Sequence, residues 1–103
     1  MWAVTEMDGK DCPIWDVLSS RGKVKVLKTL VDTEELNITE IVRKTELSHR
    51  SVQNYLSELC DTGLVELKKF GRIRIYRYRV EVARARALQY LFKIWDHDYT
   101  YHD

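Results

Sequence analysis

The strongest structural signal of the chain lies in the segment Asn37-Ile38-Thr39-Glu40-Ile41-Val42-Arg43-Lys44-Thr45-Glu46-Leu47-Ser48-His49-Arg50-Ser51-Val52. Asn37 and Glu40 have the spacing of a capping box, in which each side chain accepts a hydrogen bond from the backbone N–H of the other residue. Ile38, Ile41 and Val42 supply the buried stripe of this short helix. Ser48 can cap a second helix after a turn at Thr45-Glu46-Leu47. Two short capped helices joined in this way predict a helix-turn-helix.

The second of these helices, residues 48–61, has two distinct faces. Gly63, just after its last turn, is a common C-terminal stop. At 100° per residue, one sector holds the apolar side chains Val52, Tyr55, Leu56 and Leu59. The opposite sector holds Arg50, Gln53, Asn54 and Ser57, with His49 and Ser51 beside it. The polar face is either an ordinary solvated surface or a surface that contacts a ligand.

A hairpin follows the helix-turn-helix. In residues 64–69 and 72–80 apolar side chains alternate with polar ones, the second run is rich in β-branched and aromatic residues, and Phe70-Gly71 separates the two runs. The alternation slips between Ile75 and Tyr76, and a β-bulge there is one way to account for it. The hairpin is interpreted as the wing of a winged helix.

The flanking segments predict further helices. Pro13 suits the first turn of a helix whose apolar face is Ile14, Trp15, Val17 and Leu18. Ser20 can cap a second helix with Val24, Leu27, Leu30 and Val31 at helical spacing and with Lys23, Lys25 and Lys28 elsewhere on the wheel. A last helix begins near Val82 and aligns Ala85, Leu88, Leu91, Phe92 and Trp95.

The predicted architecture is α+β and mostly α: a winged helix-turn-helix with a two-stranded β-hairpin wing and a C-terminal dimerisation helix. We expect an N-terminal arm over residues 1–12, one domain over residues 13–96 and a flexible tail over residues 97–103. A chain of 103 residues has room for one compact domain. Its N-terminus lacks the basic start and apolar stretch of a secretory signal, and no apolar run approaches bilayer-spanning length, so we expect a cytoplasmic protein.

The formal net charge of +1 hides an uneven distribution along the chain. Residues 1–40 carry −3, residues 41–80 carry +5 and residues 81–103 carry −1. Residues 68–86 contain eight cations against a single acid, Glu81: Lys68, Lys69, Arg72, Arg74, Arg77, Arg79, Arg84 and Arg86. Positive charge concentrated in one segment of a near-neutral protein indicates a polyanionic partner.

These features together predict binding to double-stranded DNA and regulation of transcription, with repression as the working expectation. Arginine pairs with guanine and Gln or Asn with adenine in the major groove, so the N-terminal half of the helix over 48–61 can read bases. The hairpin cations can hold phosphates or enter a minor groove. The predicted DNA-binding residues are Ser48, His49, Arg50, Ser51, Gln53, Asn54, Ser57, Lys68, Lys69, Arg72 and Arg74. A protein-interaction module and a non-specific chromatin protein are the alternatives, and the concentrated arginine argues against the first.

The C-terminal helix carries more apolar bulk than one wall of a small domain absorbs, which predicts a homodimer. Its predicted interface residues are Leu88, Leu91, Phe92 and Trp95. The alternative is that this helix only closes the monomer's own core.

The order of elements resembles the ArsR-type winged helix-turn-helix regulators, especially small archaeal members, over roughly residues 14–95. The similarity lies in Asn37–Val42, in Leu47–Leu56, in Asp61-Thr62-Gly63-Leu64-Val65 and in Phe70–Tyr76. It implies that His49, Arg50, Ser51, Gln53 and Asn54 contact DNA and that the terminal helices form a dimer. Members usually have Gly in the turn where this chain has Glu46, and the metal-sensing members have a cysteine cluster that this chain lacks.

No motif for catalysis or cofactor binding is present, so we expect a non-enzymatic protein without cofactor or metal. There is no phosphate-binding glycine loop and no nucleophile motif. His97 and His102 lie in the predicted tail, where no metal site would be preorganised. Cys12 and Cys60 fit no metal-binding spacing and are expected to be reduced, partly buried thiols.

Overall fold

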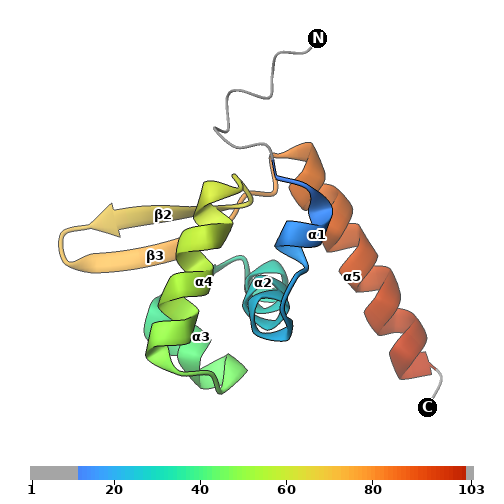
Figure 1. Cartoon of the computed structure of the whole chain (residues 1–103), viewed down its shortest axis with the longest axis horizontal. Helices are drawn as coiled ribbons and strands as arrows, with labels where there is room; N and C mark the ends of the chain where they lie inside the picture. Colours follow the sequence, from blue (N-terminus) through green and yellow to red (C-terminus); the bar gives the residue numbers. More distant parts are fainter. Residues whose placement is uncertain (1–11, 102–103) are drawn as a thin grey trace, which may run out of the picture.

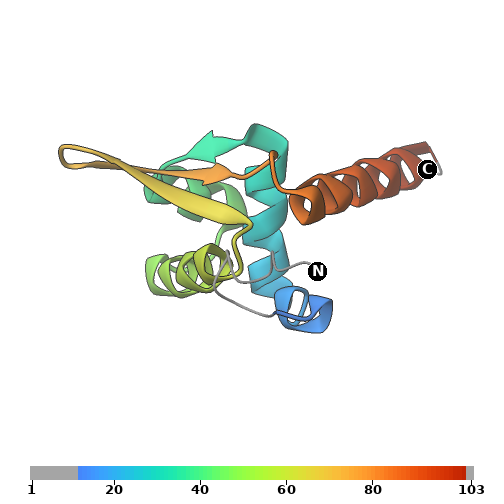
Figure 2. The ribbon, with the colours of Figure 1, turned by 90° about the horizontal axis from the view of Figure 1, so that it is seen from above.

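The computed structural model describes residues 12–101, with side chains placed through residue 98. In chain order the elements are α1 (Ile14–Val17), α2 (Arg21–Thr33), β1 (Glu35–Leu36), α3 (Ile38–Thr45), α4 (His49–Asp61), β2 (Val65–Phe70), β3 (Ile73–Tyr78) and α5 (Ala83–Tyr101). Helices α2, α3 and α4 pack together beside the sheet, while the β2–β3 hairpin and α5 extend from opposite sides of this body (Figure 1; Figure 2). This is a winged helix-turn-helix, mostly helical, as predicted. Within residues 12–101 no helix combines the length and apolar composition needed to cross a bilayer.

The predicted caps are present and set the starts of the three helices of the body. The Asn37 side chain accepts from the Glu40 backbone N–H at 2.9 Å, and the Glu40 carboxylate accepts from the Asn37 N–H at 3.0 Å. The hydroxyls of Ser20 and Ser48 accept from backbone N–H groups three residues later. Each cap satisfies an N–H that the first helical turn leaves unpaired.

The core lies where α2, α3 and α4 meet the base of the sheet. Val26, Leu27, Leu30, Ile41 and Tyr78 are among its fully buried side chains. Gly22, on α2, lets α4 approach closely, because a Cβ there would lie 2.7 Å from Cε2 of Tyr55. These contacts fix the orientation of α4 against the rest of the body.

The sheet has three antiparallel strands in the order β1-β3-β2, so the hairpin gains a short third strand that the sequence did not predict. In this strand Leu36 pairs with Tyr76. A β-bulge does not account for the slip in alternation, because the register runs without interruption from the Val65–Tyr78 pair to the Phe70–Ile73 pair. The apolar alternation slips for a different reason: Tyr76 faces the core, whereas Ile75 belongs to the opposite face of the sheet.

Two expectations, for α1 and for Lys23 of α2, are wrong in detail. Of the apolar residues predicted to bury α1, only Val17 is buried, because α1 is a single turn on the outside of the body. Lys23 is 8% exposed, with its ammonium donating to the Asp16 carbonyl and paired with Glu58 at 2.9 Å. Helix α5 continues to Tyr101, since no Gly or Pro stops it. The predicted N-terminal arm lies outside the described residues, except for Cys12.

Candidate nucleic-acid interface

Helix α4 is held rigidly on one face and presents the other to solvent. Val52, Leu56 and Leu59 are completely buried and fix the helix against α2, α3 and β2. The Ser48 hydroxyl accepts from the Ser51 backbone N–H at 3.1 Å and also donates to the Ser51 hydroxyl at 3.0 Å. These two serines therefore build the start of the helix, and the O–H of Ser48 is already donated within it.

The remaining predicted side chains of α4 form a single exposed polar face: His49, Arg50, Gln53, Asn54 and Ser57. In the part of the chain that the structure describes, none of these five side chains has a hydrogen bond or an ion pair with the protein. Such a face can donate to and accept from base edges without first breaking an internal contact. The face is at the N-terminal end of α4, which is the end that enters the major groove in this class of motif.

The acidic residues of α4 lie at its other end. Glu58 is paired with Lys23 of α2, with 2.9 Å between its Oε1 and the Lys23 Nζ. Asp61 is exposed at the last turn of the helix. The two carboxylates thus lie away from the face that would meet a polyanion, and one of them is neutralised.

The wing is a long hairpin (Figure 2), and its sequence places a second group of cations at the end. Lys69 and Arg74 are cross-strand partners, and Arg72 lies in the two-residue turn beside Gly71, which has φ of 62°. All three cations are exposed and, among the described residues, have no hydrogen bond or ion pair. Lys68 differs, because its ammonium lies 3.3 Å from a carboxylate oxygen of Glu35 on β1.

The arginines at the base of the wing have internal partners instead. Arg77 donates to Glu66 and, through both terminal nitrogens, to Glu81; these pairs raise the pKa of Arg77 and hold that of Glu81 at about 2. Arg79 also bonds Glu81, and donates to the Gly63 carbonyl at 3.3 Å. The continuous basic segment seen in the sequence therefore divides into an open tip and an occupied base.

The first two arginines of α5 continue this internal network. Arg84 donates to the Thr62 carbonyl at 2.9 Å. Arg86 donates to the carbonyls of Val80 and Glu81 at 3.1 and 3.0 Å. These bonds join the end of α4, the base of the wing and the start of α5 into one unit.

Sequence reasoning did not include Arg43 and Lys44, which lie exposed in the last turn of α3. The first helix of a helix-turn-helix crosses the DNA backbone, so cations there can reach phosphates. Both residues contribute to the net positive charge of the 41–80 segment. The signal was ambiguous, because basic residues also favour the C-terminal end of any helix.

The predicted dimer residues on α5 divide into buried and exposed ones. Leu88 is 7% exposed and belongs to the monomer's own core, because α5 packs on the body through its first half. Phe92 is half-buried against that core. Leu91 and Trp95 are 42% and 67% exposed, and their neighbours Tyr90 and Ile94 are exposed as well. Helix α5 therefore keeps an apolar surface that the body does not cover.

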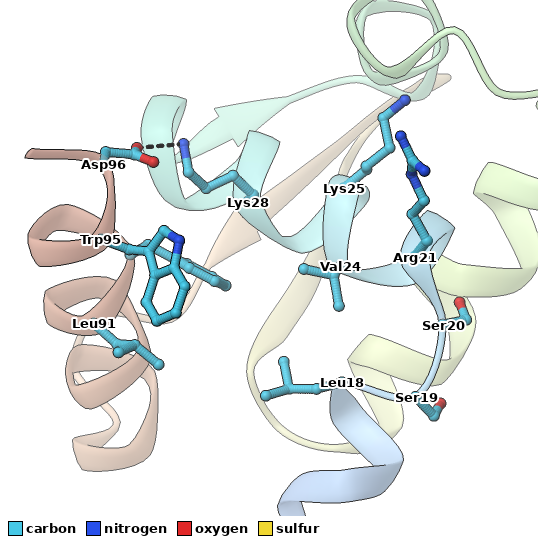
Figure 3. A pocket seen from close by; sticks show the side chains of 11 residues that line it. Leu18, Ser19, Ser20, Arg21, Val24, Lys25, Lys28, Leu91, Trp95 and Asp96 are labelled. Atoms are coloured by element: carbon cyan, nitrogen blue, oxygen red, sulfur yellow. Dashed lines mark ion pairs between the residues drawn. The ribbon is translucent and has the colours of Figure 1, made fainter. Parts of the chain in front are cut away.

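A groove of about 600 Å³ lies between this surface and α2. Trp95 and Leu91 project into it from α5, opposite Val24 of α2 and Leu18 at the end of α1 (Figure 3). The Lys28 ammonium pairs with Asp96 at 2.7 Å at one end of the groove. A second groove of about 300 Å³ lies between α1 and α5 and also includes Leu91.

The described residues contain no group of three or more His, Cys, Asp or Glu side chains placed to hold a metal. Cys12 and Cys60 are free thiols, and both are partly buried, as predicted. Burial raises the pKa of Cys60 to about 11, with the Asp61 and Glu66 charges adding to the effect. A thiol with that pKa is protonated at neutral pH and is a poor metal ligand.

Comparison with known proteins identifies a family and a set of similar folds. A family model described as "Sugar-specific transcriptional regulator TrmB" matches residues 20–82, more than half of the chain. No curated protein sequence gives a significant match.

Three solved structures illustrate the shared fold. The AntR antimony-specific transcriptional repressor is 17% identical, with 84% of this chain and 77% of that chain covered and a TM-score of 0.69. The homodimeric winged helix-turn-helix domain of Mb0332 from Mycobacterium bovis is 20% identical, with 87% and 81% covered and a TM-score of 0.67. The transcriptional repressor BigR from Xylella fastidiosa is 23% identical, with 79% and 81% covered and a TM-score of 0.66.

Proposed function

This chain belongs to the TrmB family of transcriptional regulators, and we propose that it reads double-stranded DNA with the exposed face of α4 while the wing tip holds phosphates. The protein is a DNA-binding transcriptional regulator; the proposal assigns the parts of that function to residues. The observation that carries it is the polar face of α4, whose Arg50, Gln53 and Asn54 are exposed and have no partner among the described residues. Repression by occupying DNA is the simplest outcome of such binding, and no reaction is assigned to the protein.

We further propose that the regulator acts as a homodimer through α5. The occupant of the exposed apolar surface is a second copy of the chain, whose α5 packs against Leu91, Ile94 and Trp95 and covers the groove beside α2. The support is the amount of large apolar surface on a helix that extends from the body (Figure 1). A two-fold axis there would present two copies of α4 to successive major grooves of a palindromic site.

The test separates base reading from phosphate binding. A duplex that the protein selects from a random pool is compared with its scrambled version, over a range of salt concentrations. Gln53→Ala and Arg50→Ala are each expected to cost about 1–3 kcal/mol on the selected duplex and much less on the scrambled one. Arg72→Ala and Arg74→Ala are expected to weaken binding to both duplexes. They should also reduce the salt slope, the slope of log affinity against log salt concentration, by about one unit per lost phosphate contact.

Lys93→Ala is the matched charge control, because Lys93 is an exposed cation on α5, on the side of the body away from the wing (Figure 1). It should change neither binding nor salt slope. Equal losses on both duplexes for the α4 variants would show that α4 does not read sequence, and would favour a non-specific DNA-binding protein. An unchanged salt slope for the wing variants would refute the role of the wing and favour the interaction module.

A further inference from the structure

The tip of the wing carries an exposed apolar pair that the phosphate-binding role does not explain. Phe70 and Ile73 are directly opposite each other across the turn and are each 58% exposed. Cross-strand partners share a face of a sheet, so the two side chains lie side by side. Ile75, half-buried, is on the same face one step closer to the body.

This pair does not contribute to the core of the protein. The sheet is anchored at the other end of the hairpin by Val65, Tyr76 and Tyr78, which are buried. The hairpin then extends well past the helices, as two views at right angles show (Figure 1; Figure 2). Large apolar side chains at the end of an exposed hairpin favour aggregation, and a polar pair would keep the strands together without that risk.

The charges around the pair identify the kind of partner that it fits. The Lys68 ammonium lies 5.9 Å from the centre of the Phe70 ring, Arg72 is in the turn, and Lys69 and Arg74 form the next cross-strand pair on the opposite face. From Leu67 to Tyr76 the chain contains no acidic residue. A partner for this surface must therefore offer dense negative charge at its edge and apolar surface within it. DNA has both, as phosphates that flank the stacked bases.

We propose that Phe70 and Ile73 form an apolar wedge that enters the minor groove beside the α4 site, opens one base step and bends the duplex. Apolar side chains inserted at a base step from the minor groove kink DNA in this manner, while nearby cations hold the phosphates on either side. Gly71 has the positive φ of 62° that the two-residue turn requires, and its Cβ position is open space, so the turn adds no side chain there beside the apolar pair. The inference rests on the DNA binding proposed above and adds a deformation to it.

The wedge also predicts where sequence preference would arise outside the α4 contacts. Pyrimidine–purine steps such as TA and CA unstack more easily than others, so they cost less to open. A preference for such a step at a fixed distance from the α4 site is expected in the selected duplexes. Phosphate contacts alone produce no such preference.

The experiment uses the selected duplex with dyes at its two ends and 2-aminopurine placed at successive positions. The wild-type protein should bend the duplex by about 20° or more and brighten 2-aminopurine at one step. Phe70→Ala and Ile73→Ala should abolish both signals, lower affinity roughly tenfold and leave the salt slope unchanged. Ile14→Ala is the matched control, because Ile14 is 56% exposed and belongs to α1, a helix that lies away from the wing (Figure 1); it should change none of these.

Arg72→Ala should do the opposite of the wedge variants, reducing the salt slope while the 2-aminopurine signal persists. A straight duplex, or bending that survives in both Phe70→Ala and Ile73→Ala, would overturn the wedge and leave the proposed function intact. A loss of self-association in these two variants would overturn it in favour of a protein contact. Failure to select any duplex would refute the proposed function itself, and the wedge with it.

Discussion

The turn between α3 and α4 stores strain that a single substitution should release. Glu46 has φ of 62° and ψ of 26°, the left-handed conformation, and its N–H donates to the Val42 carbonyl at 2.8 Å. This is the position where similar regulators usually have Gly. The side chain is exposed and has no hydrogen bond or ion pair among the described residues. We predict that Glu46→Gly stabilises the protein.

The expected gain is the difference between two opposing effects. A left-handed conformation costs an L-residue roughly 1–2 kcal/mol, which Gly avoids. Gly loses more backbone entropy on folding, which costs about 0.5–1 kcal/mol. The free energy of unfolding should therefore rise by about 0.5–1 kcal/mol, equivalent to roughly 2–8 °C in Tm for a domain of this size. Glu34 at the end of α2, with φ of 74° and ψ of −42°, should show a gain at least as large when changed to Gly.

The assay is urea unfolding followed by circular dichroism, at one protein concentration so that any association contributes equally. Lys44→Gly is the control, because Lys44 is exposed two residues earlier but within helix α3. It should destabilise by up to about 1 kcal/mol. DNA affinity should be unchanged in Glu46→Gly, because the turn keeps its conformation. A Glu46→Gly protein that loses stability as Lys44→Gly does would refute the reasoning.

Three further predictions concern assembly, cofactors and pH. Leu91→Asp should convert a micromolar dimer into a monomer in sedimentation while Lys93→Asp does not; a monomeric wild type would end the dimer proposal. DNA affinity should be identical before and after treatment with a chelator, and a large loss would require a metal site. The buried Tyr78 hydroxyl donates to the Ala85 carbonyl at 2.7 Å, and burial raises its pKa from 10.0 to about 12. Unfolding free energy should therefore fall as pH rises from 10 to 12, because the unfolded chain loses this proton first; Tyr78→Phe should weaken that fall in pH-dependent denaturation curves.

Local features of the fold could be predicted because each depends on a few neighbouring residues. The Asn37–Glu40 box and the Ser48 cap are formed within four residues of chain, and the faces of α4 follow from helical spacing alone. The same is true of the hairpin turn at Gly71. The exposed polar side chains of α4, which we propose to face DNA, could be identified for this reason, since an exposed face is what remains once the buried face is known.

Features that depend on distant partners could not be predicted. Strand β1 is two residues long and exists only because Glu35 and Leu36 pair with Arg77 and Tyr76 of β3. Lys23 looks like a surface cation on the helical wheel. In the structure its ammonium donates to the Asp16 carbonyl of α1 and pairs with the Glu58 carboxylate of α4. Leu88 and Leu91 have the same apolar character on α5, and only the position of the body decides which of them is buried.

The basic segment, residues 68–86, shows most clearly how contacts with distant residues change the function expected from the sequence. Sequence counting gives eight cations over residues 68–86, but Arg77, Arg79, Arg84 and Arg86 are held by protein oxygens. Withdrawing them would break the bonds that join the wing to α4 and α5, so we expect them to stay in place when DNA binds. Each phosphate contact contributes about −0.9 to the slope of log affinity against log salt. The wing of one protomer should therefore contribute a slope of about −3 to −4, where eight free cations would give about −7. Arg86→Ala should accordingly lower protein stability and leave the salt slope unchanged. Arg74→Ala should reduce the salt slope and leave protein stability unchanged. A slope that falls equally in both variants would show that the base of the wing opens on DNA.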